Sequence, residues 1–123
     1  MCDDIDFRKE NDILSNGWES NSTNFNKGYE DLCDKENTWY GWNPGQQVGA
    51  MYFIFQEVGT AYFSFENCYS GGSVEVFLNE QVISEASSSE RKNITFDYSI
   101  GDKLTIAELM SIWKLHSLKL CHN

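Results

Sequence analysis

The segment from residue 59 to residue 83 constrains the fold of this chain more than any other part of its sequence. It reads GTAYFSFENCYSGGSVEVFLNEQVI, and aromatic or aliphatic residues alternate with polar ones on both sides of a Gly-Gly pair. Alternation of this kind puts apolar side chains on one face of a strand and polar side chains on the other. The segment therefore predicts antiparallel strands with one buried and one wet face.

Similar segments continue through the second half of the chain and are separated by turn residues. The expected strands cover residues 3–7, 51–57, 60–67, 73–79, 81–85, 92–98, 103–108 and 112–120. Apolar residues near helical spacing would also suit an amphipathic helix over residues 106–118. Alternation that slips at Ser117 instead favours a strand with a β-bulge. Seven or eight short strands predict an all-β fold, an antiparallel β-sandwich or jelly roll.

The first half of the chain is richer in turn residues. Residues 11–28 are polar and contain many Asn, Ser and Gly residues, which favour turns. Trp18 and Phe25 are expected to anchor these loops onto the core. A second aromatic segment, Trp39–Gly45, combines two tryptophans and a tyrosine with turn residues. We therefore expect a loop-rich N-terminal half.

Size and charge exclude several classes of protein. A chain of 123 residues suits one domain over residues 1–123, and its 15% aromatic content is too high for a disordered acidic tail. A net charge of -10 argues against nucleic acid and anionic membranes as partners. No apolar stretch approaches the roughly 20 residues of a membrane helix, so we expect no membrane insertion.

The four cysteines, Cys2, Cys33, Cys68 and Cys121, form no CxxC pair, which disfavours zinc and thioredoxin-like sites. Two disulfides, together with glycosylation sequons at Asn21 and Asn93, predict a secreted, extracellular glycoprotein. Three connectivities are open. We favour Cys68–Cys121 with Cys2–Cys33, because Cys68 and Cys121 both end strand patterns; the rival is Cys2–Cys121 with Cys33–Cys68.

The second half of the chain resembles the galactose-binding-domain-like β-sandwich, or jelly roll, of carbohydrate-binding modules and lectin domains. The segments that carry the resemblance are Val74–Ile83, Ile94–Tyr98, Gly101–Ile106 and Leu115–Cys121. One departure is the turn at Asn79-Glu80, where Asn-Gly is usual, and this predicts a strained or longer turn. The resemblance implies ligand binding and names no particular sugar.

The aromatic residues of the first half are the main ligand-binding candidates. Flat aromatic faces stack on sugar rings and cost little entropy to order, and neighbouring amides would bind hydroxyl groups. The candidates are Trp18, Trp39, Tyr40, Trp42, Asn43, Gln46 and Gln47. The alternative is that the aromatic residues close one end of the core, since tryptophan is usually well buried.

Acidic residues suggest a structural calcium ion, because hard cations are held by converging carboxylate oxygens. The candidate ligands are Asp3, Asp4 and Glu108, although the sequence has no EF-hand spacing. Calcium also recurs in the resembled sandwiches as a structural ion. The alternative is a solvated acidic surface, and no other cofactor is expected.

No catalytic motif is present in the sequence. The two histidines, His116 and His122, have no partner at a catalytic or zinc-binding spacing and are expected to be structural or tail residues. The sequence therefore predicts a non-enzymatic, lectin-like module that binds a glycan or glycoprotein through an aromatic loop surface. The alternative is a structural or adhesive module that contacts another protein or a second copy of itself.

Overall fold

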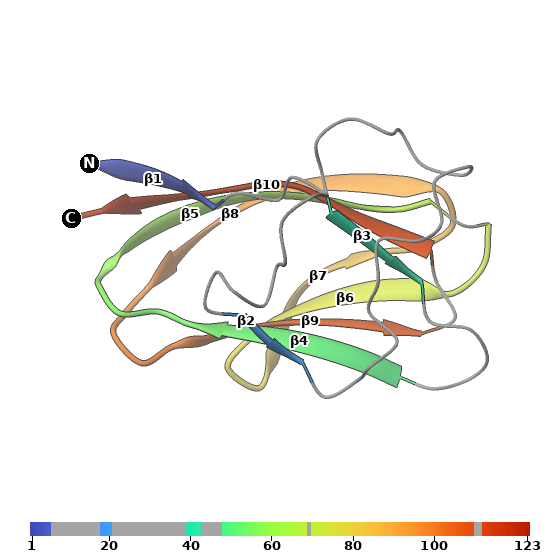
Figure 1. Cartoon of the computed structure of the whole chain (residues 1–123), viewed down its shortest axis with the longest axis horizontal. Coiled ribbons are helices and arrows are strands. Elements are labelled where there is room, and N and C mark those ends of the chain that lie inside the picture. The colour runs from blue at the N-terminus through green and yellow to red at the C-terminus, as the bar shows by residue number, and fades with distance from the viewer. Residues whose placement is uncertain (6–17, 21–38, 43–47, 69, 110–111) are drawn as a thin grey trace.

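The computed structural model describes residues 1–5, 18–20, 39–42, 48–68, 70–109 and 112–123. All regular elements among these residues are β-strands, arranged in two facing antiparallel sheets (Figure 1). The strands are β1 (Cys2–Ile5), β2 (Trp18–Ser20), β3 (Trp39–Trp42), β4 (Val48–Ile54), β5 (Gly59–Asn67), β6 (Ser73–Leu78), β7 (Gln81–Ala86), β8 (Glu90–Tyr98), β9 (Lys103–Leu109) and β10 (Ile112–His122).

The first sheet has the order β1-β10-β5-β8, and β3 also pairs with β10. Because β1 pairs with residues 118–121 and β3 with residues 112–115, these two short strands follow one another along the same edge of β10. The second sheet has the order β2-β4-β9-β6-β7. Neighbouring strands in both sheets are antiparallel throughout the described residues.

The core lies between the sheets and is built from every second residue of the longer strands. Phe63 and Phe65 of β5 are buried while Tyr62 is exposed, as a period of two requires. Phe55 stacks on Tyr98 with ring centroids 4.0 Å apart. The other buried apolar residues are Met51, Ala61, Val74, Val76, Ala86, Leu104, Ile106, Trp113, Leu115, Leu118 and Leu120.

A bulge in β10 keeps this pattern in register. The pairing with β5 shifts between Leu115 and Ser117, where the sequence predicts a bulge. Leu115 and Leu118 are both buried although three positions separate them. Without the extra residue, the apolar side chains beyond the slip would point to the solvent face.

The Asn79-Glu80 turn contains two residues, since Leu78 pairs with Gln81, so of the two alternatives, a strained or a longer turn, the longer turn is wrong. Asn79 takes the left-handed conformation with φ 57°, which asparagine tolerates better than most residues. Its side-chain carbonyl accepts a hydrogen bond from the Lys103 amide at 3.0 Å. The turn is thereby fastened to β9 of the same sheet.

The structure confirms the sandwich, corrects one alternative and adds two short strands. The helical alternative is wrong, because residues 103–109 and 112–122 are strands that hydrogen-bond to neighbours on both sides. The half expected to consist mainly of loops contributes two further strands, β2 and β3, which pair with longer strands. No helix in the part of the chain that the structure describes is long and apolar enough to cross a membrane.

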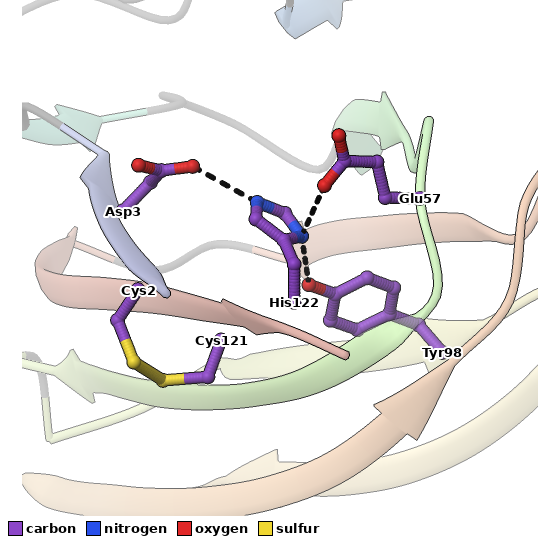
Figure 2. Close-up of a disulfide and its surroundings, with 6 residues drawn as sticks. All are labelled: Cys2, Asp3, Glu57, Tyr98, Cys121 and His122. Atoms are coloured by element: carbon purple, nitrogen blue, oxygen red, sulfur yellow. Dashed lines mark hydrogen bonds and ion pairs between the residues drawn. A yellow bond between two sulfur atoms is a disulfide. The ribbon is translucent and has the colours of Figure 1, made fainter.

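The favoured disulfide pairing is also wrong. Cys2 is bonded to Cys121, and their Cα atoms lie 4.0 Å apart (Figure 2). Antiparallel pairing explains the error: Cys121 lies opposite Thr60, so Cys68 lies about 26 Å further along β5 at roughly 3.3 Å per residue. Two cysteines on adjacent strands cannot form a disulfide when they lie at opposite ends of the strand pair. Cys68 is also disulfide-bonded, and Cys33, its partner in the rival pairing, lies outside the described residues.

Candidate functional site

A groove of about 560 Å³ lies on the outer face of the first sheet. It crosses all four main strands of that sheet. Its lining residues are Cys2, Asp4, Tyr62, Phe63, Ser64, Asn93, Ile94, Thr95, Ser117, Lys119 and Cys121. The polar members among them occupy the alternate positions that point away from the core.

The strand register sets these side chains in rows across the sheet. Asp4 lies opposite Lys119, Lys119 opposite Tyr62, and Tyr62 opposite Thr95. Directly opposed side chains on one face of an antiparallel pair lie about 5 Å apart. One carboxylate, one ammonium group, one aromatic ring and one hydroxyl therefore follow one another across the groove floor.

A second row lies beside the first. Ser117 is opposite Ser64, and Ser64 is opposite Asn93. The β10 bulge puts Ser117 on this outer face, because it follows the shift in register after Leu115. The row adds the exposed Ser117 hydroxyl and the exposed Asn93 amide to the groove, whereas Ser64 is buried.

Tyr62 is the exposed aromatic residue of the groove, at 47% exposure, whereas Phe63 is buried. An exposed large aromatic side chain among hydrogen-bonding groups presents an apolar ring face with polar groups around it. Within the described part of the chain, the side chains of Asn93, Thr95, Ser117 and Lys119 have no side-chain hydrogen bond or ion pair to another residue. Their donors and acceptors are therefore available to a ligand or to water.

Polar pairs surround this open region. Thr60 Oγ1 donates to Asp97 Oδ1 at 2.8 Å on one side. On the other side, Arg91 Nε donates to Ser64 Oγ at 3.1 Å, and His116 Nε2 lies 2.7 Å from Glu66 Oε1. These pairs hold their own side chains in place.

A cluster of paired polar groups, which we call the His122 cluster, lies where the chain ends meet. His122 Nε2 is 2.9 Å from Asp3 Oδ2, and Nδ1 is 3.0 Å from both Glu57 Oε2 and the Tyr98 hydroxyl (Figure 2). The contacts join β1, β10, the end of β8 and the β4–β5 connection. Burial, followed by the carboxylates of Glu57 and Asp3, raises the pKa of Tyr98.

Gly59 allows the tyrosine of this cluster to approach the first sheet closely. It pairs with both His122 and Tyr98. A Cβ atom at Gly59 would collide with the backbone oxygen of Cys121 and with the Tyr98 ring. Glycine is therefore required where the ring crosses β5.

The structure brings only part of the predicted ligand-binding set near the groove. Trp39, Tyr40 and Trp42 form β3, which lies beside β10 in the groove sheet (Figure 1). Trp18 is on β2 in the other sheet. Asn43, Gln46 and Gln47 lie outside the described residues. Their part in binding stays a prediction.

The predicted calcium ligands lie on two sheets. Asp3 and Asp4 are neighbours on β1, and Asp3 contacts His122 while Asp4 lines the groove. Glu108 is on β9, where its backbone pairs with Gly49 and Val74. No group of three or more His, Cys, Asp or Glu side chains among the described residues is arranged to hold a metal ion. Calcium binding stays a prediction.

The sequence pattern did not mark Tyr62, Asn93, Thr95 and Lys119 as site residues. Each occupies a solvent-facing position in an alternating strand, and this pattern alone is typical of any half-buried sheet. Only the register of four strands shows that these positions adjoin one another.

No known family model and no curated protein matches this sequence. Solved structures do match in fold. A family 29 carbohydrate-binding module, CBM29-2, solved in complex with cellulohexaose, has a TM-score of 0.61 at 12% identity, covering 97% of this chain and 90% of that one. The C-terminal CBM6 of LamC from Zobellia galactanivorans has a TM-score of 0.54 at 15% identity, covering 96% and 98%.

A third match is the K1 cleaved adhesin domain of Lys-gingipain from Porphyromonas gingivalis W83, with a TM-score of 0.51 at 11% identity, covering 99% of this chain and 90% of that one. At identities this low, the structural matches establish the fold alone. The chain has the galactose-binding-domain-like β-sandwich fold of carbohydrate-binding modules.

Proposed function

We propose that this protein is a non-enzymatic, secreted module that binds a glycan, free or on a glycoprotein, in the groove of the first sheet. The observation that carries the proposal is an exposed Tyr62 ring among side chains with unused hydrogen-bonding capacity. Sugars offer the complementary surface, since their rings have apolar faces and their edges carry hydroxyl groups. Carbohydrate-binding modules among the fold neighbours support the proposal.

The groove offers both kinds of hydrogen-bonding group that hydroxyls need. The Lys119 ammonium group donates, the Asp4 carboxylate accepts, and Asn93 and Thr95 do both. They extend from regular strands rather than long loops. Little entropy is then lost when they are ordered around a ligand, which matters for weakly bound sugars.

Substitution of Tyr62 tests the proposal. Cellohexaose and soluble β-glucan, mannan and galactan would be titrated in a calorimeter and run in affinity gels. Tyr62→Ala should weaken binding at least tenfold, equivalent to about 1.4 kcal/mol, whereas Tyr62→Phe keeps the ring and should retain most of the affinity. Tyr52→Ala is the matched control, because Tyr52 is a tyrosine on the second sheet.

Trp39→Ala and Trp42→Ala, measured with the same sugars, test the aromatic segment expected from the sequence. Because β3 adjoins β10 beyond the groove, lost affinity would extend the binding surface along that edge. Unchanged affinity in both variants, with a loss in Tyr62→Ala, would confine the site to the groove.

The second candidate function is adhesion to another protein. The adhesin-domain neighbour favours it, as does the exposure of Val58, Val82 and Ile100. No detectable binding to any of these saccharides, together with self-association in analytical ultracentrifugation, would refute glycan binding and support adhesion.

A further inference from the structure

One of the two glycosylation sequons lies within the groove sheet. Asn93, Ile94 and Thr95 are consecutive residues of β8, and this Asn-x-Thr motif is an acceptor for N-linked glycans. Asn93 and Thr95 are exposed, whereas Ile94 packs against the core. The strand therefore presents the two residues of the motif that matter for modification on one solvent-facing side.

The same two residues line the groove. Asn93 lies opposite Ser64, and Thr95 lies opposite the exposed Tyr62. Residues two apart on a strand are separated by about 6.6 Å, so a sugar attached to Asn93 would begin beside the aromatic ring.

We propose that Asn93 is an N-linked glycosylation site whose attached glycan occupies the groove and excludes external glycans. The exclusion rests on the proposed function. In the modification, the Asn93 amide nitrogen forms a bond to the anomeric carbon of a lipid diphosphate-linked oligosaccharide. The bond from that carbon to the diphosphate oxygen breaks, the amide loses a proton, and the lipid diphosphate leaves.

The position of β8 gives the glycan room. It is the last strand in the order β1-β10-β5-β8, so no other described strand pairs with its outer edge. A glycan joined at Asn93 is free to extend over that edge or to turn inward across Thr95 and Tyr62.

Because the glycan on Asn93 would be covalently attached, it would compete for the groove more effectively than a free sugar. A group tethered by a short flexible link has an effective concentration in the millimolar range. The open groups of Ser117, Lys119 and Thr95 would bind the hydroxyls of the attached sugar as they would those of an external one. A free ligand must then displace an intramolecular competitor.

The experiment uses an Asn21→Gln background, which leaves Asn93 as the only sequon in the sequence. The full chain is produced in a eukaryotic secretory host and in a bacterial host without N-glycosylation. Mass spectrometry of the peptide containing Asn93 measures site occupancy. Titration with cellohexaose and soluble β-glucan, mannan and galactan measures binding.

We expect Asn93 to be glycosylated in most of the eukaryotic product. The affinity of this product for the saccharides should be at least tenfold below that of the bacterial product. Asn93→Gln removes the sequon, so this variant should bind with the same affinity whether it is made in the eukaryotic or the bacterial host. Thr95→Ser keeps the sequon and should remain glycosylated and blocked.

An unmodified Asn93 in secreted, folded protein would refute the proposed glycosylation. Full occupancy with unchanged affinity would overturn the exclusion. If the unglycosylated protein binds none of these sugars although circular dichroism shows it to be folded, the proposed function fails and the exclusion with it. The glycosylation of Asn93 is then tested by mass spectrometry alone, since it does not depend on glycan binding.

Discussion

The groove and the His122 cluster share strands β1, β8 and β10, and their polar side chains are arranged in opposite ways. In the cluster, both nitrogens of His122 are in contact with partners from other parts of the chain. In the groove, Asn93, Thr95 and Lys119 have no such side-chain partner within the described residues. Polar groups that satisfy one another hold the fold, whereas open ones around an aromatic ring are suited to a ligand.

The Cys2–Cys121 bridge lies between the two regions, since Cys121 precedes His122 and both cysteines line the groove. Cys2→Ala with Cys121→Ala should have the largest effect on stability. The bridge spans 119 residues in sequence, and loop-closure entropy predicts a loss of about 4–5 kcal/mol in the free energy of unfolding. Urea unfolding at equilibrium measures it.

Gly59→Ala is a second destabilised variant for comparison, because it disturbs the same end of the sandwich and leaves the bridge in place. If the double cysteine variant unfolded at the same urea concentration as the parent chain, backbone pairing and the His122 cluster alone would hold the chain ends. The bridge would then have no part in stabilising either region.

His122→Ala should distinguish the roles of the two regions most clearly, because we expect it to change stability and not glycan affinity. It leaves two carboxylates and the Tyr98 hydroxyl without their shared partner, at a cost of about 1–2 kcal/mol, a modest value because Asp3 and Glu57 are largely exposed. Urea unfolding should record this loss while glycan affinity stays the same. A fall in affinity with normal stability would place the cluster in the binding site.

Lys119→Met should have the reverse effect. Methionine keeps much of the side-chain length but removes the ammonium group, so affinity for a bound saccharide should fall two- to tenfold, as for one hydrogen bond of about 0.5–1.5 kcal/mol. Stability should change little. Lys103→Met is the matched control, because its ammonium group lies 4.3 Å from the centre of the Tyr52 ring on the other sheet.

Alkaline pH should weaken the cluster with the smallest of these effects. Because the pKa of Tyr98 is raised in the folded chain, the unfolded chain releases the phenolic proton first as the pH rises above about 10. The folded chain then binds more protons, so stability must fall with increasing pH. Tyr98→Phe should flatten this decline in urea unfolding between pH 9 and 11; an equally steep decline would assign it to other groups.

The longer strands could be predicted from the sequence because alternation is a local property. Residues 59–67 and 73–78 form strands as expected, since buried apolar residues recur at every second position, as at Phe63 and Phe65 or Val74 and Val76. The short strands β2 and β3 escaped prediction. Three or four residues carry too little periodicity, and their pairing with β4 and β10 depends on distant parts of the chain.

The candidate site was harder to predict than the fold. The sequence indicated aromatic residues of the first half as ligand-binding candidates, yet the exposed Tyr62 lies in a strand whose pattern is fully explained by a half-buried sheet. Similarly, His122 was expected to be a structural or tail residue, and its partners Asp3 and Glu57 could not be predicted because they are far away in sequence.

The sequence by itself determined an all-β sandwich with alternate residues buried, because strand periodicity acts between near neighbours. Tertiary structure alone decided that Cys121 pairs with Cys2 and that Asp4, Lys119, Tyr62 and Thr95 share one row. The physical reason is strand register. It is set by how whole strands pack and pair, so it brings together side chains whose separation along the chain carries no trace of their contact.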